Sequence, residues 1–324
     1  MSTKPALSVI LLAPYGIDKL DNVMLTMSRQ TIAEHVQIII ATQPGESLIQ
    51  TWPELHSVLA VPVENFTYAG PAKMAAIRVA ESELIAFAED HCFPEPGWAE
   101  ALVEAHKGPY AAVSPWMGSA NPHRVWSVAS FFNFLPSHSE QRGRRNSLPT
   151  HNSCYKKRLL LEFGENLGEL LEMETARLVP DLLCRGWTVL HEPNARVWHL
   201  NIEKFSTFVC EQFYGGRHYG WIRASNWSMK RKVVYAVGSV LIPALRLVRQ
   251  GRSLVNFVPR RYWPAVLFGF LVNAGGEAWG YLAGLGRTCE ARMDLECWRE
   301  RFLIDHLSTE NLLARFESVD SRVR

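Results

Sequence analysis

The sequence predicts an α/β protein built on a mostly parallel sheet with helices on both faces. Two observations predict this class. Over the first hundred residues, short apolar runs alternate with segments whose apolar residues recur at helical spacing, which is the pattern of a sheet built from strand–helix–strand units. The run LIAFA at residues 84–88 also has the length and character of a strand buried on both faces.

The predicted elements up to residue 114 follow in a regular order. Apolar runs place strands at residues 8–13, 36–41, 58–61, 83–88 and 111–114. One helix is expected over residues 20–27. Gly70-Pro71 opens a second helix that runs through Ala80, because proline is favoured at the first helical position.

Beyond residue 114 the pattern is less regular. The long aromatic and polar region at 115–150 predicts a functional loop or lid, with a disordered insertion as the alternative. A helix is expected at 174–185, with Pro180 as a complication inside it and Gly186 as its end. Two short strands, 187–190 and 196–200, are then joined by Glu192-Pro193-Asn194.

Composition excludes several classes of protein. The 324 residues carry a formal net charge of +2 and are 48% hydrophobic, so neither a disordered chain nor one that generally coats nucleic acid is expected. The first apolar run meets Pro14 too early for a signal peptide and is better interpreted as a strand. Six scattered cysteines form no CxxC pair, which favours reduced, mostly structural thiols in the cytoplasm.

The strand at 83–88 ends on three ionisable side chains, Glu89, Asp90 and His91. The carboxyl ends of strands are where open α/β sheets bind ligands. In an extended segment, Glu89 and His91 would point to one side and Asp90 to the other. Two such groups can share a divalent cation, and the cation can hold a diphosphate. A charged turn that merely ends a core strand is the alternative.

Four blocks of sequence resemble, in the same order, family 2 glycosyltransferases of the GT-A fold. They are LSVILLAPYG, AIRVAESELIAFAEDHCFPEPGW, HNSCYKKRLLLEFG and METARLVPDLLCRGWTVLHEPNARVWHLN, which together span roughly residues 7–201. The resemblance implies a GT-A domain over residues 1–204. It also implies a nucleotide-diphospho-sugar donor, a divalent metal (Mn²⁺ or Mg²⁺), and inversion at the anomeric carbon with a carboxylate as base.

The resemblance also implies roles for residues of the metal motif and the base. The family's Asp-x-Asp motif falls on Glu89-Asp90-His91, so that Glu89 and His91 are metal ligands and Asp90 lies beside the diphosphate. Imidazole in place of the closing acid suits Mn²⁺ or a similar ion. The family's later histidine matches His199, which would complete the metal shell. The family's Glu-Asp pair falls on Glu174-Thr175, which makes Glu174 the first candidate for the base and Glu172 the second.

Further candidates would contact the donor or the acceptor. Pro14 and Tyr15 lie in the first block, where the first strand ends. Lys73 and Arg78 precede the metal strand and are candidate phosphate ligands, with solvated surface positions as the alternative. His151 and Asn152 are expected to line the acceptor side, and a helix N-cap is the alternative role for Asn152.

Departures from the family's pattern support a second hypothesis, a degenerate GT-A domain that binds a sugar nucleotide or a glycan without catalysis. No acid follows the second strand, at Ala41-Thr42, to read the base of the donor, and His91 and Thr175 stand where the family has acids. A nucleotidyltransferase is a third class, but it would need a glycine-rich basic loop after the first strand, and APYGIDKLDN is not one.

Residues 205–324 are expected to form a helical, membrane-associated region. Apolar runs at 233–248 and 262–286 are flanked on every side by arginine and lysine, and two full spans would carry the arginine-rich connection across the bilayer, against the positive-inside rule. Amphipathic helices in the cytoplasmic interface, or a shallow re-entrant pair, fit these charges better. This location suits a surface-glycan or lipid-linked acceptor. The alternative to a membrane-associated region is a soluble helical domain or a dimer interface. A dimer interface would make the protein a homo-oligomer. Residues 288–324 read as a polar surface tail.

Overall fold

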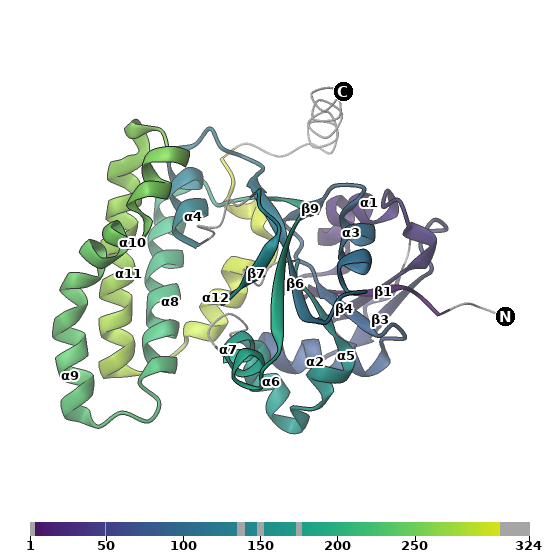
Figure 1. Ribbon diagram of the computed structural model, residues 1–324, viewed down its shortest axis with the longest axis horizontal. Helices are drawn as coiled ribbons and strands as arrows, with labels where there is room; N and C mark the ends of the chain where they lie inside the picture. Colours follow the sequence, from purple (N-terminus) through teal and green to yellow (C-terminus); the bar gives the residue numbers. More distant parts are fainter. Residues whose placement is uncertain (1–3, 49, 135–139, 148–151, 173–176, 305–324) are drawn as a thin grey trace. The chain divides into compact units, whose positions relative to one another are not determined.

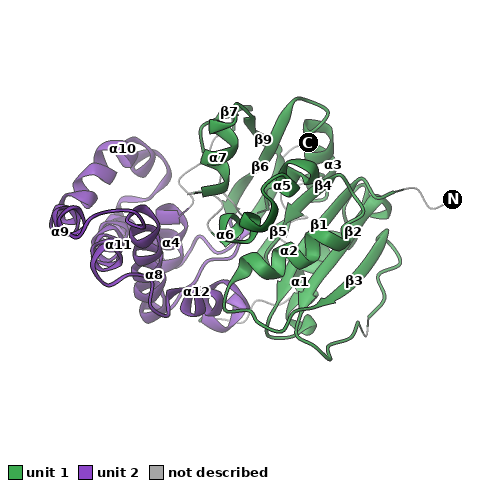
Figure 2. Cartoon of the chain, turned by 90° about the horizontal axis from the view of Figure 1, so that it is seen from below, with its two compact units in different colours: residues 1–118, 138–198, 303–324 green, residues 119–137, 199–302 purple. Residues whose placement is uncertain are grey.

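A computed structural model describes residues 4–48, 50–134, 140–147, 152–172 and 177–304. The chain divides into two compact units, coloured separately in Figure 2. Unit 1 comprises residues 1–118, 138–198 and 303–324, and unit 2 comprises 119–137 and 199–302. The helical unit therefore includes residues 119–137 as well as helices that follow residue 204.

Unit 1 is built on a mixed sheet with the strand order β3-β2-β1-β4-β8-β6-β9-β5, and β7 pairs with β9. The strands are β1 Leu7–Ala13, β2 Val36–Thr42, β3 Ser57–Pro62, β4 Leu84–Phe87, β5 Cys92–Pro94, β6 Tyr110–Ser119, β7 Gly143–Arg145, β8 Cys154–Lys156 and β9 Thr188–His199. The neighbours β3, β2, β1 and β4 are parallel, and β8 runs antiparallel to both β4 and β6. The predicted fold class, a largely parallel α/β sheet, is confirmed.

Helices cover the sheet of unit 1. They are α1 Asp21–Ser28, α2 Ala69–Val79, α3 Trp98–Ala105, α5 Lys157–Leu161, α6 Leu167–Glu172 and α7 Val179–Cys184. Figure 1 shows α1 and α3 on one side of the strands and α2 and α5 on the other. The core between sheet and helices includes the fully buried Ile39, Ile77, Ile85 and Leu160. Each such side chain contributes about 1.5–3 kcal/mol relative to an exposed one.

Several sequence predictions need correction. Residues 115–150 are not one long loop, because the described part contains the end of β6, the helix α4 (Val125–Phe134) and β7. The two strands predicted near 187–200 are one continuous strand, β9. Pro193 lies within it, and beside Pro193 the Glu192 carboxylate accepts the Asn194 N–H at 3.2 Å.

The helix predicted at 174–185 is described only from residue 177. Within it, residues 177–178 are π-helical and α7 begins at Val179, so Pro180 lies in the first turn of α7. The predicted end is confirmed: Gly186 has a φ of +83°, and its N–H donates to the Leu183 carbonyl.

Close helix packing fixes α6 against the first turn of α2. A Cβ atom on Gly70 would lie 1.9 Å from the carbonyl oxygen of Gly168, so only glycine permits this approach. At the same contact, the Glu172 carboxylate accepts the Gly70 N–H at 3.1 Å. The C-terminal end of α6 is thereby held at the helix start that follows β3.

Unit 2 is helical. Besides α4 it contains α8 Phe205–Arg223, α9 Met229–Gly238, α10 Ile242–Phe257, α11 Trp263–Ala283 and α12 Thr288–Glu296. Four glycines let α8 and α11 pack backbone to backbone: a Cβ on any of them would lie 2.0–2.3 Å from a carbonyl oxygen of the facing helix. They are Gly216, Gly220, Gly276 and Gly280. The acid in the second apolar run, Glu277, is buried here and paired with Arg223 at 2.8 Å.

The segment after α12 is not a surface tail as far as it is described. Arg299 is only 2% exposed and pairs with Glu211 of α8 at 2.8 Å and with Glu296 at 2.7 Å. Burial raises the pKa of Glu211, although Arg299 opposes the shift. A buried charge pair needs both partners, because removing one leaves the other desolvated and unpaired.

A buried histidine makes the stability of unit 1 depend on pH. Burial lowers the pKa of His106 from 6.5 to about 4, and its Nε2–H donates to the Cys154 carbonyl at 3.2 Å. Because the unfolded chain binds this proton more readily, stability is complete above pH 6.5 and falls as the pH drops towards 4. At pH 5 the loss is about 2 kcal/mol.

We expect His106→Gln, which retains an N–H donor, to remove this part of the pH dependence. Urea unfolding of wild type and variant at pH 8 and pH 5 measures it. An equal loss of stability in both proteins on acidification would contradict the assignment.

Candidate functional site

The carboxyl ends of the parallel strands lie together at one edge of the sheet. Ala13 and Thr42 are register partners at the ends of β1 and β2, and the Ala88 N–H donates to the Ile10 carbonyl. Pro14 and Tyr15 follow β1 directly at this edge. The Pro14 carbonyl accepts a hydrogen bond from the Gln43 side chain at 3.0 Å, and Tyr15 is 37% exposed. These two candidate donor contacts therefore lie at the same edge as Glu89.

Glu89 to Cys92 form a turn rather than the extended segment predicted from the sequence. The Cys92 N–H donates to the Glu89 carbonyl at 3.2 Å, because the chain must reverse from β4 into β5. The turn places both acids on the His91 ring: Asp90 Oδ1 lies 2.6 Å from Nδ1, and Glu89 Oε2 lies 3.4 Å from Nε2. The His91 side chain is fully buried, whereas Glu89 is 25% exposed.

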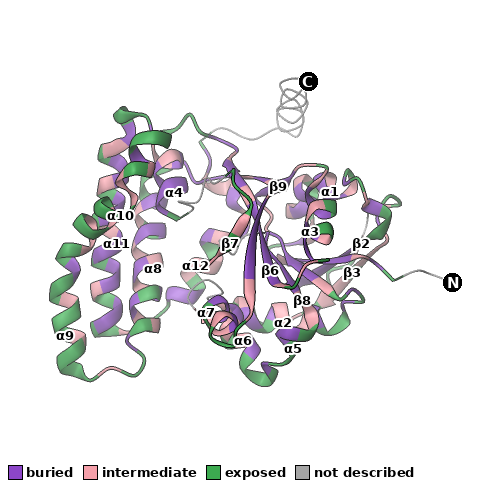
Figure 3. Cartoon of the chain, in the orientation of Figure 1, coloured by how far each residue is buried: buried purple, intermediate pink, exposed green. Residues whose placement is uncertain are grey.

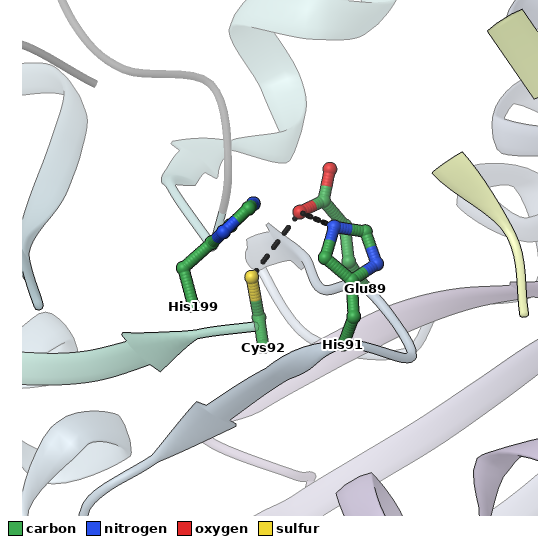
Figure 4. A group of neighbouring side chains, drawn as sticks. All are labelled: Glu89, His91, Cys92 and His199. Atoms are coloured by element: carbon green, nitrogen blue, oxygen red, sulfur yellow. Dashed lines mark hydrogen bonds and ion pairs between the residues drawn. The ribbon is translucent and has the colours of Figure 1, made fainter. Parts of the chain in front are cut away.

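The turn itself supplies a further ligand-type residue, Cys92, and strand pairing brings His199 to it. Cys92 is the first residue of β5 and His199 is the last of β9, and these strands are neighbours joined by the Glu95 N–H to the Arg196 carbonyl. One ligand atom from each of Glu89, His91, Cys92 and His199 lies within 4.8 Å of the others. Figure 4 shows the four side chains converging from the turn and from the two strands.

Hydrogen bonds determine which ring nitrogen of His199 is able to bind a metal. Its Nδ1 lies 2.9 Å from Asn201 Oδ1. The Asn201 Nδ2 group itself donates to Ser119 Oγ and to the His199 carbonyl, which identifies Oδ1 as the acceptor. His199 Nδ1 must then carry the proton, which leaves its Nε2 as the nitrogen able to ligate a metal.

The donor set fits a divalent transition metal. One carboxylate and two imidazoles are ligands that such ions share, and the hydrogen bonds of Asp90 and Asn201 orient the rings as outer-shell partners do in metal proteins. When bound, a cation here would supply a positive charge for an anionic ligand. Sequence analysis assigned no role to Cys92. The signal that existed was its place directly after Glu89-Asp90-His91, which makes four consecutive ligand-type residues.

Asn152 precedes β8, and its side chain is buried without a partner among the described residues. The Phe87 N–H donates to the carbonyl of the next residue, Ser153, so Asn152 is the chain neighbour of a residue bonded to the end of β4 that leads to Glu89. Its side chain is 0% exposed, and neither Oδ1 nor Nδ2 has a hydrogen-bond partner within the described part of the chain. It is no helix N-cap, because the next helix, α5, has Lys156 at that position.

The other predicted site residues differ in where they lie relative to the metal cluster. Lys73 lies half-buried in α2, where its Nζ donates to the Leu171 carbonyl and lies 5.0 Å from the centre of the Phe87 ring. Arg78 is exposed in the last turn of α2, towards the start of β4, so the structure does not bring it to the Glu89 edge. Glu172 is engaged with Gly70. His151 and Glu174 lie outside the described residues.

The comparisons with known proteins show the fold. No family model matches the sequence, and no curated protein matches it. Among solved structures, a mannosyltransferase (PcManGT) from Pyrobaculum calidifontis in complex with GDP-Man and Mn²⁺ is 14% identical, with 86% of this chain and 88% of that chain covered and a TM-score of 0.51. The chain has the GT-A fold. A GalNAc-T7 structure with UDP, GalNAc and Mn²⁺ is also 14% identical, with a TM-score of 0.46. That match covers 62% of this chain, which spans only 44% of the GalNAc-T7 chain.

Proposed function

We propose that this chain is a metal-assisted, inverting glycosyltransferase of the family 2 type. It moves a hexosyl group from a nucleotide-diphospho-sugar to a surface-glycan or lipid-linked acceptor, as in polysaccharide synthesis. The observation that carries the proposal is the convergence of Glu89, His91 and His199 at the carboxyl edge of a GT-A sheet. Transfer from a sugar nucleotide develops negative charge on the departing diphosphate, and a cation held by these residues would stabilise that charge.

Asn152 supports binding of a polar ligand. A buried amide whose oxygen and nitrogen both lack partners costs about 1–3 kcal/mol for each group. The backbone of Asn152 has a φ of +53°, a conformation that asparagine adopts more readily than most other non-glycine residues. Unsatisfied buried polar groups of this kind often have a functional role. We assign Asn152 to hydrogen bonding with the donor or the acceptor.

Thermal stabilisation by a panel of uridine- and guanosine-diphospho-sugars, each with Mn²⁺, Mg²⁺ or Zn²⁺, tests the function. A donor at about 100 times its Kd stabilises the folded state by about 2.7 kcal/mol. Release of nucleoside diphosphate from that donor then measures turnover. Binding without turnover would favour the non-catalytic sugar-nucleotide-binding domain, and absence of both would contradict the proposal.

We expect Asn152→Gly to weaken binding of the donor or the acceptor without lowering the stability of the fold. Glycine tolerates the positive φ and removes two unpartnered polar atoms, so the free energy of unfolding should stay unchanged or rise. Donor or acceptor affinity should fall by about tenfold, as loss of one hydrogen bond predicts. Calorimetric titration and urea unfolding of the same preparations measure the two effects. A clear loss of stability with unchanged affinity would assign Asn152 to the scaffold instead.

We further propose that α9 and α10 bind the cytoplasmic face of the membrane. The stretch 229–257 is the one described segment that is long and apolar enough to span a bilayer, and only 6% of its apolar window is buried within the protein. Figure 3 shows how exposed these helices are. Val237, Val240 and Val248 are 71–85% exposed. Of the flanking cations, Arg246 is held inside by Asn273 at 2.6 Å, whereas Lys230 and Arg249 are exposed.

We expect Val240→Asp/Val248→Asp to weaken binding to vesicles that contain anionic lipid by about 100-fold, because two inserted apolar side chains are lost. Folding should be unaffected, since both positions face solvent. Leu161→Asp, at an exposed position on α5 of unit 1, is the matched control. Vesicle co-sedimentation measures the effect. Equal binding by the double variant and the control would exclude this face as the membrane contact.

A further inference from the structure

We infer that Cys92 is a metal ligand and that the site binds Zn²⁺ in preference to Mn²⁺ or Mg²⁺. This inference deepens the proposed function, since it concerns the cation of the same site. It starts from the chemistry of the donor atoms: a carboxylate oxygen, two imidazole nitrogens and a thiol sulfur lie within 4.8 Å of one another. Mg²⁺ and Mn²⁺ favour oxygen ligands, whereas thiolate and imidazole favour Zn²⁺.

The position of the Cys92 sulfur supports a shared ion. Sγ lies 3.2 Å from Glu89 Oε2, which itself lies 3.4 Å from His91 Nε2. Two ligands bound to one tetrahedral Zn²⁺ at about 2.0–2.3 Å are separated by about 3.3–3.6 Å. Octahedral Mg²⁺, with ligands at about 2.1 Å, would place neighbouring donor atoms only about 3.0 Å apart. The 3.4 Å between Glu89 and His91 matches the tetrahedral spacing, and the 3.2 Å between Cys92 and Glu89 lies between the two spacings.

The burial of the ligands and the orientation of the two histidine rings also favour Zn²⁺. Cys92 is 0% exposed and His199 is 5% exposed, so three of the four ligands, His91 included, are buried and only Glu89 reaches solvent. The strands and the turn fix the buried three, and Asp90 and Asn201 hydrogen-bond to the ring nitrogens that face away from the ion. A rigid set of soft and borderline ligands selects among ions by donor type, and Zn²⁺ lies well above Mn²⁺ in intrinsic affinity for such donors.

The other cysteines of the sheet provide a matched comparison. Cys154 on β8 is also 0% exposed, and burial raises the pKa of its thiol, so it should remain protonated and inert. It belongs to no ligand group among the described residues. Cys92→Ala and Cys154→Ala therefore remove the same atom from equally buried positions in one sheet, and differ in the predicted loss of a metal ligand.

The test uses the full chain, freed of metal by a chelator and without nucleotide. Competitive titration should show a single Zn²⁺ per chain, bound at least about 100-fold more tightly than Mn²⁺. Co²⁺, which replaces Zn²⁺ in such sites, should give an absorption band from thiolate-to-metal charge transfer. Cys92→Ala should lose that band and about 100-fold or more in Zn²⁺ affinity, whereas Cys154→Ala should retain both.

Retention of the band and of Zn²⁺ affinity in Cys92→Ala would overturn the inference, as would equal affinities of the wild-type chain for Zn²⁺ and Mn²⁺. The wild-type measurement decides the question even if Cys92→Ala does not fold. Failure here is distinguishable from failure of the proposed function. If the site binds Mn²⁺ and a sugar nucleotide and Cys92→Ala has no effect, only the zinc inference is wrong. If the site binds Zn²⁺ but the protein binds no sugar nucleotide, only the proposed transferase function is wrong.

Discussion

Glu174→Gln is expected to leave donor binding intact and to lower the rate of sugar transfer by about two to four orders of magnitude. The amide keeps the size of the carboxylate but cannot take the proton of the acceptor hydroxyl, which is a poor nucleophile at neutral pH. The measurement is release of nucleoside diphosphate from the donor that stabilises the protein, with donor affinity determined by calorimetry on the same variant.

Glu172→Gln is the matched variant for this experiment. The structure gives Glu172 a scaffold contact, because its carboxylate accepts the Gly70 N–H at the start of α2. An amide oxygen can accept the same bond, so Glu172→Gln should retain most of the activity. If Glu172→Gln were inactive and Glu174→Gln active, the general base would be Glu172, two residues before the predicted position. Full activity of both variants would contradict an inverting mechanism with either acid as base.

His91→Ala is expected to weaken metal-dependent nucleotide binding by about 100-fold or more, and folding far less. His91 is fully buried and contacts both Glu89 and Asp90, so its removal deletes a metal ligand and leaves two acids without their shared imidazole. Loss of these buried contacts should lower the free energy of unfolding by about 1–3 kcal/mol.

The measurement for His91→Ala is nucleotide affinity by calorimetry with and without a chelator, beside urea unfolding. His106→Gln provides the control, since His106 is another buried histidine of unit 1 that lies outside the metal cluster. Metal-dependent affinity in His91→Ala equal to that of His106→Gln would remove His91 from the site.

The sequence predicted the strands at the centre of the sheet because their burial leaves a strong local signal. Continuous apolar runs such as β1, β2 and β4 are typical of strands buried on both faces, and the Glu89-Asp90-His91 run that follows β4 is visible without coordinates. The same holds for Gly186, where a helix can end with a positive φ. These features depend on neighbours within a few residues, so local physics is sufficient to predict them.

The tertiary structure decided what depends on contacts between distant segments. His199 meets Glu89, His91 and Cys92 only because β9 lies beside β5, which brings residues far apart in the chain to one point. The turn at Glu89 overrode the extended geometry expected there, because the chain has to enter β5. Lys73 and Arg78 look alike in the sequence, but they are placed differently because a helix of this length carries its last turn to the opposite edge of the sheet. Pairing of distant strands, and not local preference, determined which of the predicted ligands meet.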